Sequence, residues 1–115
     1  MEKENIILVK SFDFALEVVD LYKKMVAQNE YVLSKQLLRS GTSIGANIEE
    51  AMAGFSKKDF THKMSISSKE ARETKYWLRL IKHSQVVQIE VDELLTKNEE
   101  LIRILTSIVK TSQNK

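Results

Sequence analysis

The sequence predicts an all-α protein, an antiparallel up-and-down four-helix bundle with a left-handed twist. Apolar residues recur about every 3.5 residues along almost the whole chain, which is the period of packed, supercoiled helices. The 115 residues include no proline and only three glycines, and short polar segments divide the periodic stretches into four. Because domains typically contain ~100–150 residues, we expect residues 1–115 to form a single bundle domain.

The first two helices are predicted over residues 6–28 and 34–54, with Asn5 and Ser34 as their N-caps. Two apolar rows widen the buried face of the first helix: Leu8, Phe12, Ala15, Val19, Tyr22 and Val26, and then Phe14, Val18, Leu21 and Met25. The row of the second helix is Leu37, Gly41, Ile44, Ile48, Ala51 and Phe55. A glycine inside a helix costs ~0.5–1 kcal/mol relative to alanine, so Gly41 and nearby Gly45 predict the close approach of another backbone.

The last two helices are predicted over residues 57–84 and 91–111. Gly54 ends the second helix, and Ser56, followed three residues later by Asp59, is typical of the cap that starts the third. Glu90 or Asp92 opens the fourth helix. The apolar row of the third helix is Phe60, Met64, Ser67, Ala71, Thr74, Leu78 and Ile81. The rows of the fourth are Val91, Leu95, Ile102, Leu105 and Val109, and then Leu94, Leu101 and Ile108.

Composition excludes several classes of protein. The absence of cysteine excludes a disulfide framework, a thiolate metal site and a cysteine nucleophile. The longest apolar run, Ile6–Val9, is far below the ~18 residues that span a bilayer. No leader-like segment opens the sequence, so we expect a cytoplasmic protein without a membrane partner. We expect neither a metal nor a cofactor, because Asp59 and His62 supply only half of the paired motif that di-iron bundles use.

Enzymatic activity has little support in the sequence. There is no glycine-rich phosphate loop and no serine nucleophile motif. Arg79 and His83 lie one helical turn apart, as in the arginine–histidine pairs of helical ribonucleases, but the spacing departs from the pattern of that family. Two solvated polar residues near a helix end are the simpler interpretation. We therefore expect a protein that is not an enzyme.

Charge is distributed unevenly. Residues 56–83 carry eight lysines and arginines and three carboxylates, a net charge of +5, whereas residues 84–101 carry a net charge of −4. A basic row follows one edge of the third helix: Lys69, Arg72, Lys75, Arg79 and Lys82. The row has three interpretations: a solvated face that pairs with the acidic segment after it, a surface that binds nucleic-acid phosphates, or a contact for an acidic protein partner.

A second row on the third helix mixes apolar and acidic residues: Ile66, Glu70, Glu73, Trp77 and Leu80. Its apolar members would be exposed in a monomer, and exposed apolar stripes usually mark interfaces. The second helix carries a polar row that can face it: Arg39, Ser43, Asn47 and Glu50. An unpaired buried charge costs several kcal/mol, so we expect Arg39 to pair with Glu50 or Glu73. The two rows form either a salt-bridge cluster within the chain or a contact between subunits.

Three segments carry a family resemblance: SKQLLRSGTSIGANIEEA (residues 34–51), SKKDF (56–60) and KEARETKYWLRLIKH (69–83). Together with residues 10–22 they resemble the bacterial four-helix proteins that are encoded in intervening sequences of 23S rRNA genes. The most specific part is the pattern of Arg39, Ser43, Asn47 and Glu50, followed by Glu73. Ala51 departs from the family, since many relatives have glycine near this position. The departure weakens the prediction of a close backbone approach at this point of the second helix.

The resemblance implies a four-helix bundle that assembles into a ring-like homo-oligomer, a pentamer, with no established catalytic activity. The accessory variability proteins of diversity-generating retroelements have a similar fold, a basic outer surface, and bind nucleic acid and a reverse transcriptase. This analogy favours a non-enzymatic oligomer that binds RNA or DNA through the basic helix edge. A protein-interaction scaffold without nucleic-acid binding is the alternative, and a ribonuclease is a weaker third.

Overall fold

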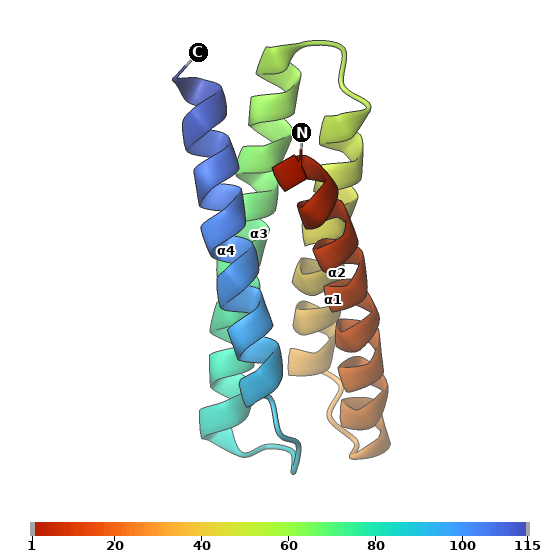
Figure 1. The fold of residues 1–115 in the computed structure, drawn as a ribbon. Coiled ribbons are helices and arrows are strands. Elements are labelled where there is room, and N and C mark those ends of the chain that lie inside the picture. Colours follow the sequence, from red (N-terminus) through yellow and green to blue (C-terminus); the bar gives the residue numbers. More distant parts are fainter. Residues whose placement is uncertain (1, 115) are drawn as a thin grey trace.

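Four helices make up the part of the chain that the computed structural model describes, residues 2–114, with side chains from residue 6 onward. They are α1 (Glu2–Ala27), α2 (Leu33–Met52), α3 (Lys57–Ser84) and α4 (Asp92–Gln113). The helices alternate in direction and are joined by short turns (Figure 1). They form a rod of 46 × 20 × 19 Å. The structure thus confirms the all-α, up-and-down bundle, and the handedness of its twist stays a prediction.

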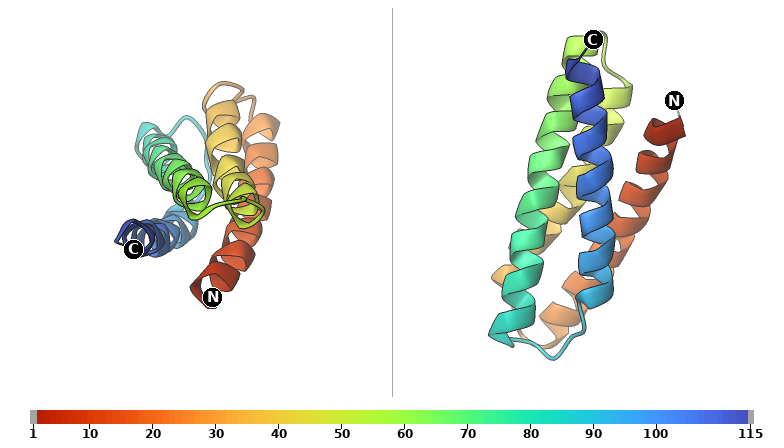
Figure 2. Two further views of the ribbon diagram at one scale, coloured as in Figure 1. Left: turned by 90° about the horizontal axis from the view of Figure 1, so that it is seen from above. Right: turned by 60° about the vertical axis from the view of Figure 1, so that its left-hand side comes forward.

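Each helix packs against two neighbours. Both α1 and α3 pack on α2 and on α4, and within the described residues no Cα atom of α1 lies within 8 Å of a Cα atom of α3. They therefore lie at diagonally opposite corners of the bundle, as the view down its length shows (Figure 2, left). This arrangement matters for function, because the outer surfaces of α1 and α3 face opposite sides of the molecule.

The helix boundaries agree with the predicted ones to within about two residues, apart from the start of the first helix. The bounds of α3 are those predicted, whereas α1 begins at Glu2, so Asn5 is a residue within the helix and not its N-cap. The predicted cap of α3 is confirmed, since the Ser56 hydroxyl accepts the Asp59 N–H at 3.0 Å. At the start of α4 the Glu90 carboxylate accepts the Asp92 N–H at 2.7 Å.

The cap of α2 differs from the prediction. The Glu30 carboxylate, not the Ser34 hydroxyl, accepts the free N–H groups of the first turn: Val32 at 3.1 Å, Leu33 at 2.9 Å and Ser34 at 2.7 Å. The Ser34 hydroxyl is buried and donates to the Glu30 carbonyl at 2.8 Å. Ser34 was the expected cap because serine is favoured at helix starts. The longer side chain of Glu30, which precedes the helix, reaches these N–H groups instead.

In α1 the second predicted row is the core, and the first row is not. Phe14, Val18, Leu21 and Met25 are buried together with Ile7, whereas Phe12 and Val19 of the first row are 60% and 38% exposed. The two rows have the same period, and only the position of the neighbouring helices determines which of them is covered. The end of the α2 row is also corrected, because Phe55 lies in the turn after α2 and is exposed.

The glycines of α2 serve the predicted close approach to α1. A Cβ atom on Gly41 would lie 2.8 Å from both methyl carbons of Val18, which is fully buried. A Cβ on Gly45 would lie 3.4 Å from the Ser11 hydroxyl, an ordinary contact distance. Gly41 is thus required by packing, while Gly45 is not.

Candidate interaction surfaces

The predicted basic row divides into two sets of residues. Lys75 and Lys82 point toward α4 and form ion pairs with Glu99 and with Asp92, the latter at 2.7 Å. The hydrogen bond from Lys82 lowers the pKa of Asp92, and the bond to Asp92 raises the pKa of Lys82. Two of the five predicted cations are therefore neutralised within the chain, as the pairing interpretation expected. Lys69, Arg72 and Arg79 remain on the solvent side, where they are exposed.

The exposed side of α3 carries a continuous row that we call the outer ridge. Its residues step by four and three along the whole helix, so they lie on one face. They are Lys58, His62, Ser65, Lys69, Arg72, Tyr76, Arg79 and His83. All of them are exposed except Ser65, which is half-buried. The ridge contains four permanent cations, two histidines and one tyrosine, and no carboxylate.

Four carboxylates beside the ridge are already paired with cations that lie off it. On the α2 side, Glu70 and Glu73 bind Arg39, and on the α4 side Glu99 and Asp92 bind the two lysines described above. No ion pair is seen for the ridge cations within the described residues; Arg72 donates to the Thr106 hydroxyl at 3.1 Å. The positive charge of the ridge is therefore available to a ligand.

The predicted polar rows of α2 and α3 meet within one chain. Arg39 binds Glu70 and Glu73, and Glu73 also accepts the Trp77 indole N–H at 2.9 Å. Of the two expected partners of Arg39, the structure selects Glu73, whereas Glu50 binds Lys63 at 2.7 Å. Ser43 and Asn47 donate to carbonyl groups of α2 itself.

The expectation that Ile66, Trp77 and Leu80 would be exposed in a monomer is also wrong. All three are half-buried, and Trp77 packs against the core. The row lay outside the predicted core stripe, but α2 covers this flank of α3, so the buried face of α3 is wider than one stripe. A contact of this row with another subunit stays a prediction.

A row of exposed apolar residues lies instead on α1. Five of them follow its outer side at steps of three, three, four and three: Ile6, Val9, Phe12, Leu16 and Val19, which are 38–61% exposed. We call this set the apolar stripe. Single exposed apolar residues are common on any protein, but a row of five on one helix is typical of a surface that another protein covers.

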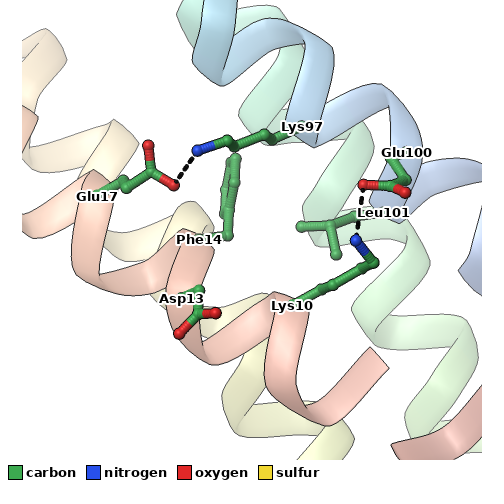
Figure 3. A pocket seen from close by; sticks show the side chains of 7 residues that line it. All are labelled: Lys10, Asp13, Phe14, Glu17, Lys97, Glu100 and Leu101. Carbon is green, nitrogen blue, oxygen red and sulfur yellow. Dashed lines mark hydrogen bonds and ion pairs between the residues drawn. The ribbon is translucent and has the colours of Figure 1, made fainter. Parts of the chain in front are cut away.

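A pocket lies between α1 and α4. Phe14 and Leu101 form its apolar floor, and two ion pairs cross its rim, Lys10–Glu100 at 3.3 Å and Lys97–Glu17 at 2.8 Å (Figure 3). The hydrogen bond from Lys97 to Glu17 raises the pKa of Lys97. These partly exposed pairs connect α1 to α4, and the depression between them is open to solvent.

The described residues contain neither a metal-binding cluster nor a membrane-spanning helix. No group of three histidine, aspartate or glutamate side chains is placed to hold a metal ion. None of the helices combines the length and apolar character that a membrane span requires.

Sequence reasoning missed five ridge residues, Lys58, His62, Ser65, Tyr76 and His83, and did not recognise the apolar stripe. The signal for the ridge was present, because its residues lie opposite the correctly predicted core row of α3. The stripe was not recognisable, since two of its residues belonged to the row that was expected to be buried.

The structure thus defines a small antiparallel helical bundle with a basic ridge on one side and an apolar stripe on the other. The family model for 23S rRNA-intervening sequence proteins matches residues 3–107. The chain belongs to this family.

A solved structure supports the same assignment. The chain is similar to a protein of unknown function from the S23 ribosomal protein family of Bacteroides thetaiotaomicron, with 45% identity and a TM-score of 0.89. The similarity covers 94% of this chain and 98% of that one. No protein with a curated description matches the chain.

Proposed function

We propose that the chain is a non-enzymatic, self-assembling bundle that binds the phosphate backbone of RNA or DNA along the outer ridge of α3. The observation that carries this proposal is the ridge itself, a helix-long row of exposed basic residues without a carboxylate. Backbone phosphates attract such a row without any reading of bases. The paired lysines, Lys75 and Lys82, are left out of the proposed contact because α4 already neutralises them.

The test is charge reversal on the ridge. Arg72→Glu/Arg79→Glu is compared with a control, Lys23→Glu/Lys35→Glu, which changes the net charge by the same amount. The two control residues lie on α1 and α2, and no ion pair of either is found among the residues that the structure describes. The measurement is fluorescence anisotropy with labelled RNA and duplex DNA from ~50 to ~200 mM salt. Wild type and control should bind, with affinity falling by ~0.7–0.9 log units per phosphate contact per decade of salt. The ridge variant should lose binding.

Two results would contradict the proposal. One is a wild-type protein that binds neither nucleic acid at ~50 mM salt, where electrostatic binding is favoured. The other is an equal loss of binding in the ridge variant and in the control, which would show that net charge and not the ridge is responsible. In the first case a protein-interaction scaffold, with an acidic partner on the ridge, is the better description.

Self-association is supported by the apolar stripe of α1. The stripe lies diagonally opposite α3, so a ring or dimer that buries α1 leaves the ridge exposed in every subunit. A stripe of this kind fits a homo-oligomer, and the family resemblance specifies a pentamer. Light scattering should report a mass several times 13.3 kDa. A monomer at micromolar concentration would remove this part of the proposal.

A ribonuclease is the remaining alternative. Arg79 and His83 are one turn apart on the exposed ridge and would bind phosphate in either case. Incubation of bound RNA distinguishes the two functions, because a binding protein leaves the RNA intact. Cleavage that disappears with His83→Ala, while binding persists, would establish the enzyme instead.

A further inference from the structure

Besides its four cations, two histidines and one serine, the outer ridge contains a single tyrosine, Tyr76. It is 52% exposed, although large aromatic side chains usually bury most of their surface. No hydrogen bond to its hydroxyl is seen within the described residues. Core packing and hydrogen bonding therefore leave the position of Tyr76 unexplained.

The neighbours of Tyr76 on the ridge are cations. Arg72 precedes it by four residues and Arg79 follows it by three, so each lies about one helical turn, ~5 Å, away along the ridge. Glu73, the carboxylate three residues before it on α3, is bound to Arg39 and to Trp77. A phosphate chain that contacts both arginines would pass directly over the tyrosine.

The ring of Tyr76 is also held in place. Its centroid lies 5.1 Å from that of Trp77, with an angle of 71° between the ring planes, an edge-to-face contact. Trp77 is fixed in turn by its indole N–H bond to Glu73 at 2.9 Å and by packing against the core. An aromatic ring that is fixed before binding loses little freedom when a ligand stacks on it.

We infer that Tyr76 is a stacking platform for an unpaired base, so that the ridge prefers single-stranded nucleic acid to duplex. The inference rests on the proposed function, since Arg72 and Arg79 would hold the flanking phosphates while the tyrosine takes the base. Aromatic side chains set between cations bind single strands in this way, and they do so without sequence preference because every base has a π-face. RNA and DNA share this chemistry.

The test uses two ligands with the same number of phosphates, a 12-nucleotide deoxyadenosine strand and a 12-unit abasic strand. Wild type should bind the first more tightly, and Tyr76→Ala should weaken that binding roughly 5- to 150-fold, the range for loss of one stacked base. Tyr76→Ala should bind the abasic strand as wild type does. Tyr76→Phe, which keeps the ring, should behave like wild type on both strands.

The single tryptophan supplies a second readout. Because Trp77 contacts the Tyr76 ring, the deoxyadenosine strand should change the tryptophan emission, whereas the abasic strand should not. Equal affinity of wild type for the two strands, or an unchanged affinity of Tyr76→Ala for the deoxyadenosine strand, would overturn the stacking role and leave backbone binding standing. Failure of wild type to bind either strand at ~50 mM salt would overturn both.

Discussion

At the scale of single residues, Glu30 shows how one side chain sets a helix boundary. Partial burial by itself raises the pKa of the Glu30 carboxyl, but the N–H groups of Leu33, Ser34 and Val32 that donate to it outweigh this effect. The pKa therefore lies below its ordinary value of 4.5. The ionised carboxylate accepts these bonds at the positive end of α2, where negative charge is favoured.

This cap predicts a pH-dependent loss of stability. Glu30→Gln should lower the free energy of unfolding at pH 7 by about 0.5–2 kcal/mol, the usual range for a lost cap. Because the folded pKa is depressed, the contribution of Glu30 is present above pH 4.5 and is lost as the pH falls through the lower folded value. Denaturant unfolding from pH 7 to 3 should show the two proteins converging at the acid end. A difference that grows on acidification would contradict this assignment.

Gly41 gives a second prediction at this scale, with Gly45 as its matched control. Gly41→Ala should destabilise the bundle by about 1–3 kcal/mol, because its new methyl group meets the rigid, buried Val18 at 2.8 Å. Gly45→Ala has room and should be neutral or stabilising by up to ~1 kcal/mol, since alanine is the better helix former. Thermal unfolding of the two variants tests the difference. Equal effects would show that α1 and α2 do not approach closest at Gly41.

At the scale of elements, α1 has two apolar rows, and the structure places one of them inside. Phe14→Ala should cost about 3–5 kcal/mol because Phe14 is only 1% exposed, whereas Phe12→Ala should change the stability of the folded subunit by less than ~1 kcal/mol. The chemical change is the same, so unfolding in urea measures only which face of α1 is buried. A larger loss of stability for Phe12→Ala than for Phe14→Ala would show that α1 turns its other apolar row toward the core.

At the scale of the whole molecule, the diagonal placement of α1 and α3 would couple the proposed assembly to the proposed binding. An oligomer formed through α1 repeats the ridge in each subunit, and repeated weak contacts on one strand raise the overall affinity. Leu16→Glu places a charge in the apolar stripe and should yield a folded protein of 13.3 kDa. Its affinity for a long RNA should fall at least about tenfold, although every ridge residue is intact.

A short oligonucleotide is the control for that variant. A strand that reaches only one ridge should bind Leu16→Glu and wild type equally, because avidity requires simultaneous contact with two subunits. Sedimentation and anisotropy on the same samples give both quantities. If Leu16→Glu is monomeric yet binds long RNA as tightly as wild type, the affinity for RNA does not depend on assembly.

The sequence by itself determined the fold class, the four helices and most of their boundaries. It did so because the 3.5-residue period, the absence of proline and the Ser56–Asp59 cap are local properties of the chain. It also predicted Glu73 as one of two possible partners of Arg39. The buried row of α3 was predicted from the rule that one face of a helix turns inward.

Only the tertiary structure decided which surfaces are free. Phe12 and Phe14 have the same side chain on neighbouring rows, and Lys75 and Arg79 are both cations on one helix, so local pattern does not separate them. The position of α2 and α4 does, because a neighbouring helix covers Phe14 while Phe12 stays exposed, and α4 places Glu99 against Lys75. Burial and charge pairing depend on residues far apart in sequence, and the ridge and the stripe are what remain uncovered.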